Sequence, residues 1–260
     1  MSAVRKLTTR SIAVVAALAL SATAQDLSPR AYVITPVGSN ALSVSYAFND
    51  GAILLDPTIP IEDLQGRFSV PILGYYRSFG LFGRSANVAV ALPYGIGNFS
   101  GVVIGQPTSV YRSGLADGRV RVAVNLRGGR AMSVPEFIKY RERTVIGASL
   151  TIIVPTGQYD PARLINPGAH RVGFKPEVGL TRRLGKWAWD GYGGLWVFTE
   201  NSSFFPGNSV RKQNLITSLE FHLGYYVRPR AWVSFDSNFW VGGNTVINGV
   251  ENQDRARNSR

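Results

Sequence analysis

The stretch "NLITSLEFHLGYYV" (residues 214–227) alternates apolar and polar side chains along its length. Leu219, Phe221 and Leu223 fall on one face, whereas Glu220 and His222 fall on the other. Successive side chains of a β-strand point to opposite sides of a sheet, so this period of two predicts a strand with two chemically different faces. The run exceeds the roughly five or six residues typical of soluble sheets and suits a tilted bilayer crossing of about 9–11 residues.

Similar alternation recurs along the chain and predicts about nine strands. They cover residues 41–49, 67–79, 84–93, 115–127, 143–155, 170–182, 186–199, 213–227 and 231–242. The links between them are long at 50–66, 94–114, 156–169 and 200–212, intermediate at 128–142, and short at 80–83, 183–185 and 228–230. Transmembrane barrels have tight periplasmic turns and long outer loops, so the alternation predicts an all-β, antiparallel transmembrane β-barrel.

The N-terminus has a different pattern from the rest of the chain. Arg5, Lys6 and Arg10 precede the apolar residues 12–20, and Ala22-Thr23-Ala24 gives the small-x-small pattern of a cleavage site. We expect residues 1–24 to be a removed signal peptide and residues 25–260 to be the barrel domain. A single membrane anchor is the alternative, but the apolar core is about half of the roughly 20 residues that a spanning helix needs.

The composition narrows the classes of function. The sequence is 45% hydrophobic and 17% charged, which favours a folded chain with a large core over a disordered one. It has no cysteine, which excludes disulfides and thiolate chemistry. The formal net charge is +12, but export argues against nucleic acid as the partner. Lipopolysaccharide, anionic solutes or a basic lumen fit the charge better.

No catalytic, metal or cofactor site emerges from the sequence. His170 and His222 are the only histidines, and neither has a second ligand at a recognisable spacing. Ser218 and His222 share a strand face about 13 Å apart, too far for a hydrogen bond. The glycine-rich runs at 191–194 and 95–101 lack the Lys-Ser/Thr ending of a phosphate loop, so close approach in a curved sheet explains them better. We therefore expect a protein that is not an enzyme.

The polar strand faces are the candidate functional surface. A charge facing lipid near the bilayer midplane costs about 2–4 kcal/mol, so these side chains are expected to point into the lumen. The candidate lumen-lining residues are Arg119, Arg121, Arg171, Lys175, Glu177, Glu220, His222, Trp232, Asp236 and Trp240. Two alternatives stay open at this point: the charges form a selectivity ring, or they pair with one another in a plug.

Four stretches resemble the family of outer-membrane transporters of the meta-pathway of phenol degradation. They are "LPYGIGNFSG" (92–101), "SGLADGRVRVAVNLRG" (113–128), residues 145–180 with their "PTGQYD" and "FKPEVG" segments, and residues 232–250. The resemblance covers most of residues 30–260. It implies an outer-membrane β-barrel associated with the catabolism of aromatic compounds, and it supplies no catalytic residues.

The chain departs from the family pattern at two places. His170-Arg171 stands where the family usually has Asn-Arg. The chain also stops at "RARNSR", where the family continues with about three more strands, and bacterial single-chain barrels have even strand numbers. The resemblance therefore implies about nine strands of an expected twelve and a barrel domain that is truncated at its C-terminus.

The main hypothesis is a channel in the bacterial outer membrane that passes small aromatic or apolar organic compounds by passive diffusion. The expected partners are outer-membrane lipid, lipopolysaccharide, small organic solutes and the barrel-assembly machinery, with no nucleic acid and no cofactor. One alternative is a structural or surface-interaction barrel of the envelope with a plugged lumen. Another is a soluble periplasmic β-protein.

The signal pattern and the long amphipathic strands predict where the mature protein is found. After cleavage behind Ala24, the protein should sediment with outer membranes and need detergent for extraction, because its apolar strand faces require lipid. Cell fractionation with a periplasmic marker as the control measures this. Recovery in the soluble periplasmic fraction would exclude the barrel.

Overall fold

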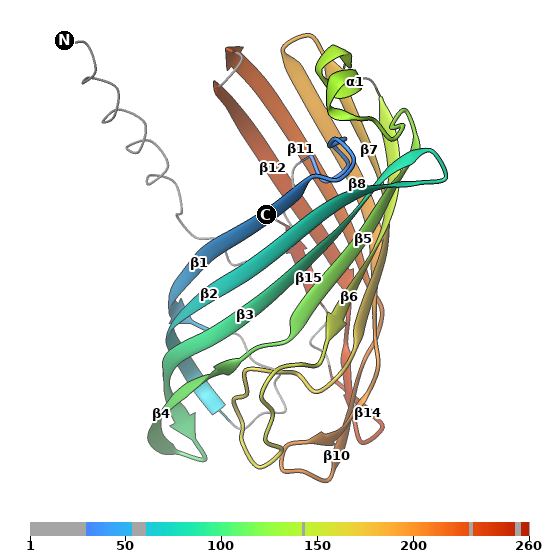
Figure 1. The fold of residues 1–260 in the computed structure, drawn as a ribbon. Helices are drawn as coiled ribbons and strands as arrows, with labels where there is room; N and C mark the ends of the chain where they lie inside the picture. Colours follow the sequence, from blue (N-terminus) through green and yellow to red (C-terminus); the bar gives the residue numbers. More distant parts are fainter. Residues whose placement is uncertain (1–29, 54–60, 142–143, 229–230, 253–255, 260) are drawn as a thin grey trace, which may run out of the picture.

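Nearly all of the described chain is antiparallel β-structure, arranged in a strongly curled sheet (Figure 1). The computed structural model describes residues 30–53, 61–141, 144–228, 231–252 and 256–259. The predicted signal peptide, residues 1–24, lies outside the described residues, and the proposed C-terminal truncation stays a prediction. The prediction of an all-β, barrel-type fold is confirmed.

The main sheet follows the chain from neighbour to neighbour in the order β1-β2-β3-β5-β6-β7-β8-β11-β12-β15. Its strands are β1 (Asn40–Ala52), β2 (Ile61–Leu81), β3 (Arg84–Val103), β5 (Gly118–Arg127), β6 (Val145–Val154), β7 (Gly173–Leu184), β8 (Trp187–Phe198), β11 (Ile216–Arg228), β12 (Ala231–Gly242) and β15 (Ala256–Ser259). Each of the nine predicted strands corresponds to one of these, and all pairings are antiparallel.

The expectation of a loop at 94–114 is wrong, because most of this link is strand. β3 continues to Val103, and β4 (Gln106–Leu115) returns along it. The first half of β3 pairs with β5 and the second half with β4, so β4 and β5 lie end to end beside one long strand. β2 likewise begins at Ile61, inside the expected link 50–66. These strands exceed the length needed to cross a bilayer and extend the sheet beyond it.

The strand faces have the reverse polarity of a soluble sheet. In β7, Lys175 and Glu177 are buried, whereas Val178 is 57% exposed. The same reversal holds in β11, where Glu220 and His222 are buried between the exposed Leu219 and Phe221. An apolar face of this extent is not left in water by a monomeric soluble protein, whereas it suits the outside of a membrane barrel. The polar side chains therefore lie on the concave face of the curled sheet.

The two ends of the sheet differ. The tight β2–β3 and β7–β8 turns lie at the end that carries α1 (Val134–Lys139), which occupies the link of intermediate length (Figure 1). Glu136 accepts hydrogen bonds from the backbone N–H and the hydroxyl of Ser133, both at 2.8 Å, and so caps the first turn of α1. These bonds, the backbone bond first, lower the pKa of the Glu136 carboxyl below its ordinary value.

The opposite end carries a second, four-stranded sheet that sequence periodicity did not reveal. Its strands are β9 (Asn201–Phe204), β10 (Ser209–Gln213), β13 (Thr245–Ile247) and β14 (Val250–Glu251), paired in the order β14-β13-β10-β9. They come from the links that follow β8 and β12, and they lie at the end where β4 projects (Figure 1). The short links therefore lie at one end of the main sheet and the long links at the other, as the predicted alternation requires.

Pro176 lies within the interior strand β7, a position that proline usually avoids because it has no N–H for the ladder. It is matched with Leu150 of β6. On the β8 side the matched residues are Phe174 and then Glu177, so the ladder skips Lys175 and Pro176 without a change of register. The sheet accommodates the missing donor by this gap in the pairing.

Among the described residues, no helix has the length and apolar character needed to span a membrane.

Two turns with the same backbone conformation provide a matched test of orientation. Phe82 and Ile104 have φ of 48° and 49°, each precedes a glycine, and they are 96% and 84% exposed. On intact cells, Ile104→Cys should react with an impermeant thiol reagent, whereas Phe82→Cys should react only after the outer membrane is opened. The absence of native cysteine keeps the background low. The reverse labelling pattern would show that the protein has the opposite orientation in the membrane.

Candidate functional site

The concave face carries a connected group of charged side chains, which we call the charge cluster. It consists of Arg121 from β5, Lys175 and Glu177 from β7, Glu220 and His222 from β11, and Asp236 from β12. All six were predicted from the sequence to face inward, and the structure brings them together although they come from four strands.

Lys175 is the centre of the charge cluster. Its Nζ lies 2.8 Å from Oε2 of Glu177 and 2.7 Å from Oε1 of Glu220. The Lys175 residue is only 3% exposed, and both carboxylates are buried as well. Isolated charges in such surroundings are strongly disfavoured, and an ion pair offsets this cost only with short contacts on both partners. The two carboxylates meet this condition around one ammonium group.

The ion pair between Lys175 and Glu220 joins strands that are not neighbours, because β8 lies between β7 and β11. The side chain crosses β8 at Gly194, where an added Cβ would lie 2.8 Å from Cε of Lys175. A larger residue at this position would displace the lysine. The glycine-rich run at 191–194 is therefore strand, and at Gly194 it allows the predicted close approach.

His222 extends the charge cluster to β12. Its Nδ1 lies 2.8 Å from Oδ1 of Asp236, whose other oxygen accepts a hydrogen bond of 2.8 Å from the hydroxyl of Ser234. The other ring nitrogen, Nε2, lies 3.7 Å from Oε2 of Glu220, which is beyond hydrogen-bond length. His222 therefore places a titratable ring between two carboxylates, and its protonation would add charge to this part of the concave face.

Tyr32, which the sequence analysis did not identify, packs against the charge cluster on the concave side of the sheet. Its hydroxyl lies 2.9 Å from Oε1 of Glu177 and 3.0 Å from Oγ of Ser149. Burial, and then the charge of Glu177, raise the Tyr32 pKa to about 12, so the phenol remains protonated and able to donate. The guanidinium of Arg121 lies 5.0 Å from the centre of the Tyr32 ring and 3.7 Å from Glu177.

Two glycines form the hollow that receives Tyr32. Gly147 and Gly179 face each other across β6 and β7. A Cβ on either glycine would lie 2.1 or 2.2 Å from the tyrosine ring, so the ring rests directly on the two backbones. Ile34, two residues further on, joins the same buried core. Two glycines at inward-facing positions of adjacent strands are the sequence signal that could have indicated a bulky side chain packed against the sheet at this point.

The other predicted lumen residues border the charge cluster, and Trp196 connects Arg119 to it, because Nζ of Lys175 lies 5.8 Å from the centre of the same ring. Near the loop end of the sheet, Arg119 lies over the ring of Trp196 at 6.0 Å, and Arg171 lies over Phe198 at 4.3 Å. Arg171 also donates to Oε1 of Gln213 at 2.5 Å.

Trp240 and Trp232 belong to β12. Trp240 donates from Nε1 to the hydroxyl of Ser218 at 3.2 Å, and Trp232 is matched with Tyr226 across β11. Both tryptophans alternate in step with Asp236, which places them on the concave side.

Several buried polar atoms on this face have no protein hydrogen-bond partner among the described residues. They include Nε2 of His222, Oδ1 of Asp190, and both amide atoms of Asn238. Buried polar atoms without protein partners are normally bonded to water, so we expect water molecules on this face. Within the described chain, no group of three or more His, Cys, Asp or Glu is arranged to hold a metal ion.

Comparisons with known proteins agree with this architecture. A family model described as "Putative MetA-pathway of phenol degradation" matches residues 56–260. Among solved structures, the chain is similar to the crystal structure of the COG4313 outer membrane channel from Pseudomonas putida F1. The TM-score is 0.66 at 20% identity, over 90% of this chain and 84% of the other. A search of curated proteins gives no significant match.

The position of Lys175 predicts a large effect on stability. Lys175→Met should lower the free energy of unfolding by roughly 3–5 kcal/mol, because it leaves two buried carboxylates without their cation. Denaturant unfolding of the refolded protein in detergent micelles measures this effect. Lys186→Met, at an exposed turn position, is the matched control and should change little.

A triple variant separates charge from packing. Adding Glu177→Gln and Glu220→Gln to Lys175→Met removes the uncompensated charges and should recover more than half of the loss. No recovery would show that the lysine acts through packing instead.

Proposed function

We propose that this chain, which belongs to the phenol-degradation family matched over residues 56–260, is a non-enzymatic channel of the outer membrane for small organic compounds. The observation that carries the proposal is the reversed polarity of the sheet, with apolar side chains exposed outside and charges buried inside. An apolar exterior requires lipid, and a polar interior suits solutes in water. The likeness to an outer membrane channel supports the same location.

The proposed path runs along the concave face by passive diffusion. At the loop end it passes Arg119 and Arg171, each of which lies over an aromatic ring. It then passes the charge cluster, where acids and bases alternate, and where polar atoms such as those of Asn238 require water. A passage that presents guanidinium groups together with aromatic faces favours small aromatic solutes, and among them carboxylates over neutral phenols.

The proposed partners follow from the two faces. Outer-membrane lipid would contact the apolar exterior, and small organic solutes would contact the interior. Contacts with lipopolysaccharide and assembly by the barrel-assembly machinery remain predictions from the sequence.

One observation favours a second candidate, a barrel with a plugged lumen. The segment around Tyr32 packs on the concave face and hydrogen-bonds to the charge cluster, so it occupies space that a channel would use. In that case the outer loops would carry the function.

Ion selectivity tests the channel against the plug. Arg119→Gln combined with Arg171→Gln should shift the anion-to-cation permeability ratio towards cations, because two positive charges leave the outer part of the path. The reversal potential of single channels in a salt gradient measures this ratio, and high salt should reduce the difference through screening. Arg182→Gln, which removes one charge from the exposed face, is the control. No conductance, or an unchanged ratio in the double variant, would favour the plugged barrel.

A further inference from the structure

Exposed basic side chains gather at the tight-turn end of the main sheet. Six of them form no ion pair and no side-chain hydrogen bond with the described residues, and we call these six the turn belt. They lie at strand ends, at a turn, or within a few residues of one. The members are Arg77 of β2, Arg84 of β3, Arg127 of β5, Arg182 of β7, Lys186 of the β7–β8 turn, and Arg228 of β11.

Acidic side chains are few at this end. In the described chain, Glu136 of α1 is the one exposed acid there, and it already contacts Arg130 at 3.2 Å. Asp190 is buried on the concave face. The segments 25–29, 142–143 and 229–230 adjoin these positions in the sequence but lie outside the described residues. Together they contain two acids and two bases, so they leave the balance of charge unchanged.

The loop end of the sheet has a different balance. Three exposed basic residues there each contact a carboxylate: Arg67 with Asp50 at 2.8 Å, Arg163 with Asp160 at 2.9 Å, and Lys212 with Glu200 at 3.2 Å. Paired charges of this kind present little net charge to a third group. The two ends therefore differ, and the turn belt gives the tight-turn end a surplus of positive charge.

Arg77 points away from the concave face. It shares its strand face with Leu73 and Tyr75, which are 49% and 41% exposed. Side chains two residues apart on a strand lie on one face, so Arg77 continues this outer row toward the tight turn. From Arg77 to the end of β2 the strand rises by about 14 Å, at roughly 3.4 Å per residue. A long basic side chain near the end of an apolar band can extend to the headgroups of the lipid.

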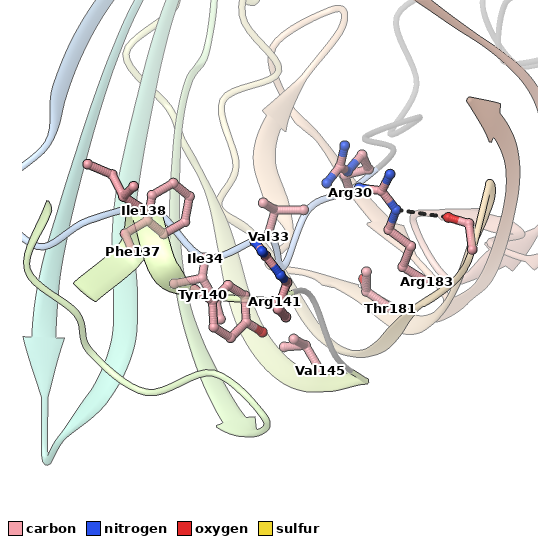
Figure 2. Close-up of a pocket in the computed structure, with 11 residues that line it drawn as sticks. Arg30, Val33, Ile34, Phe137, Ile138, Tyr140, Arg141, Val145, Thr181 and Arg183 are labelled. Carbon is pink, nitrogen blue, oxygen red and sulfur yellow. Dashed lines mark hydrogen bonds between the residues drawn. The ribbon is translucent and has the colours of Figure 1, made fainter. Parts of the chain in front are cut away.

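Arg182 has an equivalent position on β7. It lies on the outer face with Val178, which is 57% exposed. The next residue, Arg183, lies on the concave side beside Arg30, as Figure 2 shows. Across the pair of β7 and β8, Arg182 is matched with Trp189. The outer face thus places a guanidinium group next to an indole ring close to the tight turn.

Further aromatic side chains lie at the same level. Trp187, the first residue of β8, is 48% exposed, and its ring centre lies 4.8 Å from that of Tyr225 of β11. Tryptophan and tyrosine on the lipid side of a barrel concentrate at the level of the headgroups. Basic side chains at this level meet phosphate oxygens, and a surplus of them favours anionic over zwitterionic headgroups.

We propose that the turn belt is an interaction surface for anionic phospholipid of the phosphatidylglycerol type in the periplasmic leaflet. Phosphodiester groups contact guanidinium groups such as those of Arg77 and Arg182, and acyl chains lie along the apolar rows that precede them. The inference rests on the predicted orientation, with the tight turns in the periplasm. It goes beyond the proposed function, since it requires a membrane location but no passage of solutes.

Quenching of tryptophan fluorescence by brominated lipid tests the surface. The full chain is reconstituted into mixed bilayers of phosphatidylglycerol and phosphatidylcholine, in which one of the two lipids is brominated. Trp187 is exposed at the level of the turn belt and reports the lipid in contact with it. Phosphatidylglycerol should bind about fivefold more tightly than phosphatidylcholine in low salt, and high salt should reduce this ratio through screening. A ratio of one in low salt would overturn the proposal.

Variants locate the contact. Arg77→Gln combined with Arg182→Gln should at least halve the ratio, because two cations leave the outer face at exposed positions that the fold does not need. Arg67→Gln combined with Arg163→Gln removes the same charge from the loop end and is the matched control, which should keep the ratio. An equal fall in both double variants, or an unchanged ratio in the first, would also overturn the proposal.

The leaflet is tested by labelling at Phe82, which lies at the same end of the sheet. Reaction of Phe82→Cys only after the outer membrane is opened supports the periplasmic leaflet. Its reaction on intact cells would place the turn belt against lipopolysaccharide and overturn the assignment to phospholipid.

Single-channel recording in the same bilayers separates this inference from the proposed function. Conductance without a preference for phosphatidylglycerol would remove the surface and keep the channel. A preference for phosphatidylglycerol in a protein without conductance would keep the surface and remove the channel.

Discussion

The interior of this sheet depends on one buried ammonium group. Lys175 is only 3% exposed, and two carboxylates lie within 2.8 Å of its Nζ to offset the cost of burying its charge. One of them, Glu220, belongs to a strand two positions away in the sheet, and the lysine reaches it only because Gly194 has no side chain. The other, Glu177, in turn holds the hydroxyl of Tyr32. A single electrostatic requirement thus connects three strands with the N-terminal segment.

The same requirement explains why the charges lie inside. A charge that faces lipid has no partner, whereas side chains on a concave face converge and can pair across strands. Pairing also limits what these charges can do for a solute, because a neutralised arginine contributes little long-range potential. Other basic groups of this face lie beside aromatic rings, with Arg119 over Trp196 and Arg171 over Phe198 near one end of the sheet.

Strand positions and strand faces could be predicted from the sequence because both depend on local periodicity. The alternation around Glu220 and His222 places them inside without knowledge of their partners. The second, four-stranded sheet could not be predicted, since strands as short as β14, Val250–Glu251, carry no periodicity. Tyr32 was also out of reach, because its hydrogen-bond partners are 117 and 145 residues away in the sequence. The extension of β3 was missed because its second half is stabilised by pairing with β4, and the sequence does not reveal the register of that pairing.

The N-terminal segment depends on the charge cluster for its position. Tyr32 is held by Glu177 of the charge cluster, and Ile34 joins the same buried core. Arg30, two residues before Tyr32, donates from its backbone N–H to Asp190 at 3.2 Å. Tyr32 fills the hollow at Gly147 and Gly179, and the short contact with Lys175 holds Glu177, the hydrogen-bond partner of Tyr32, in position. Loss of that ion pair would therefore disturb the backbone of residues 30–34 through Glu177 and Tyr32.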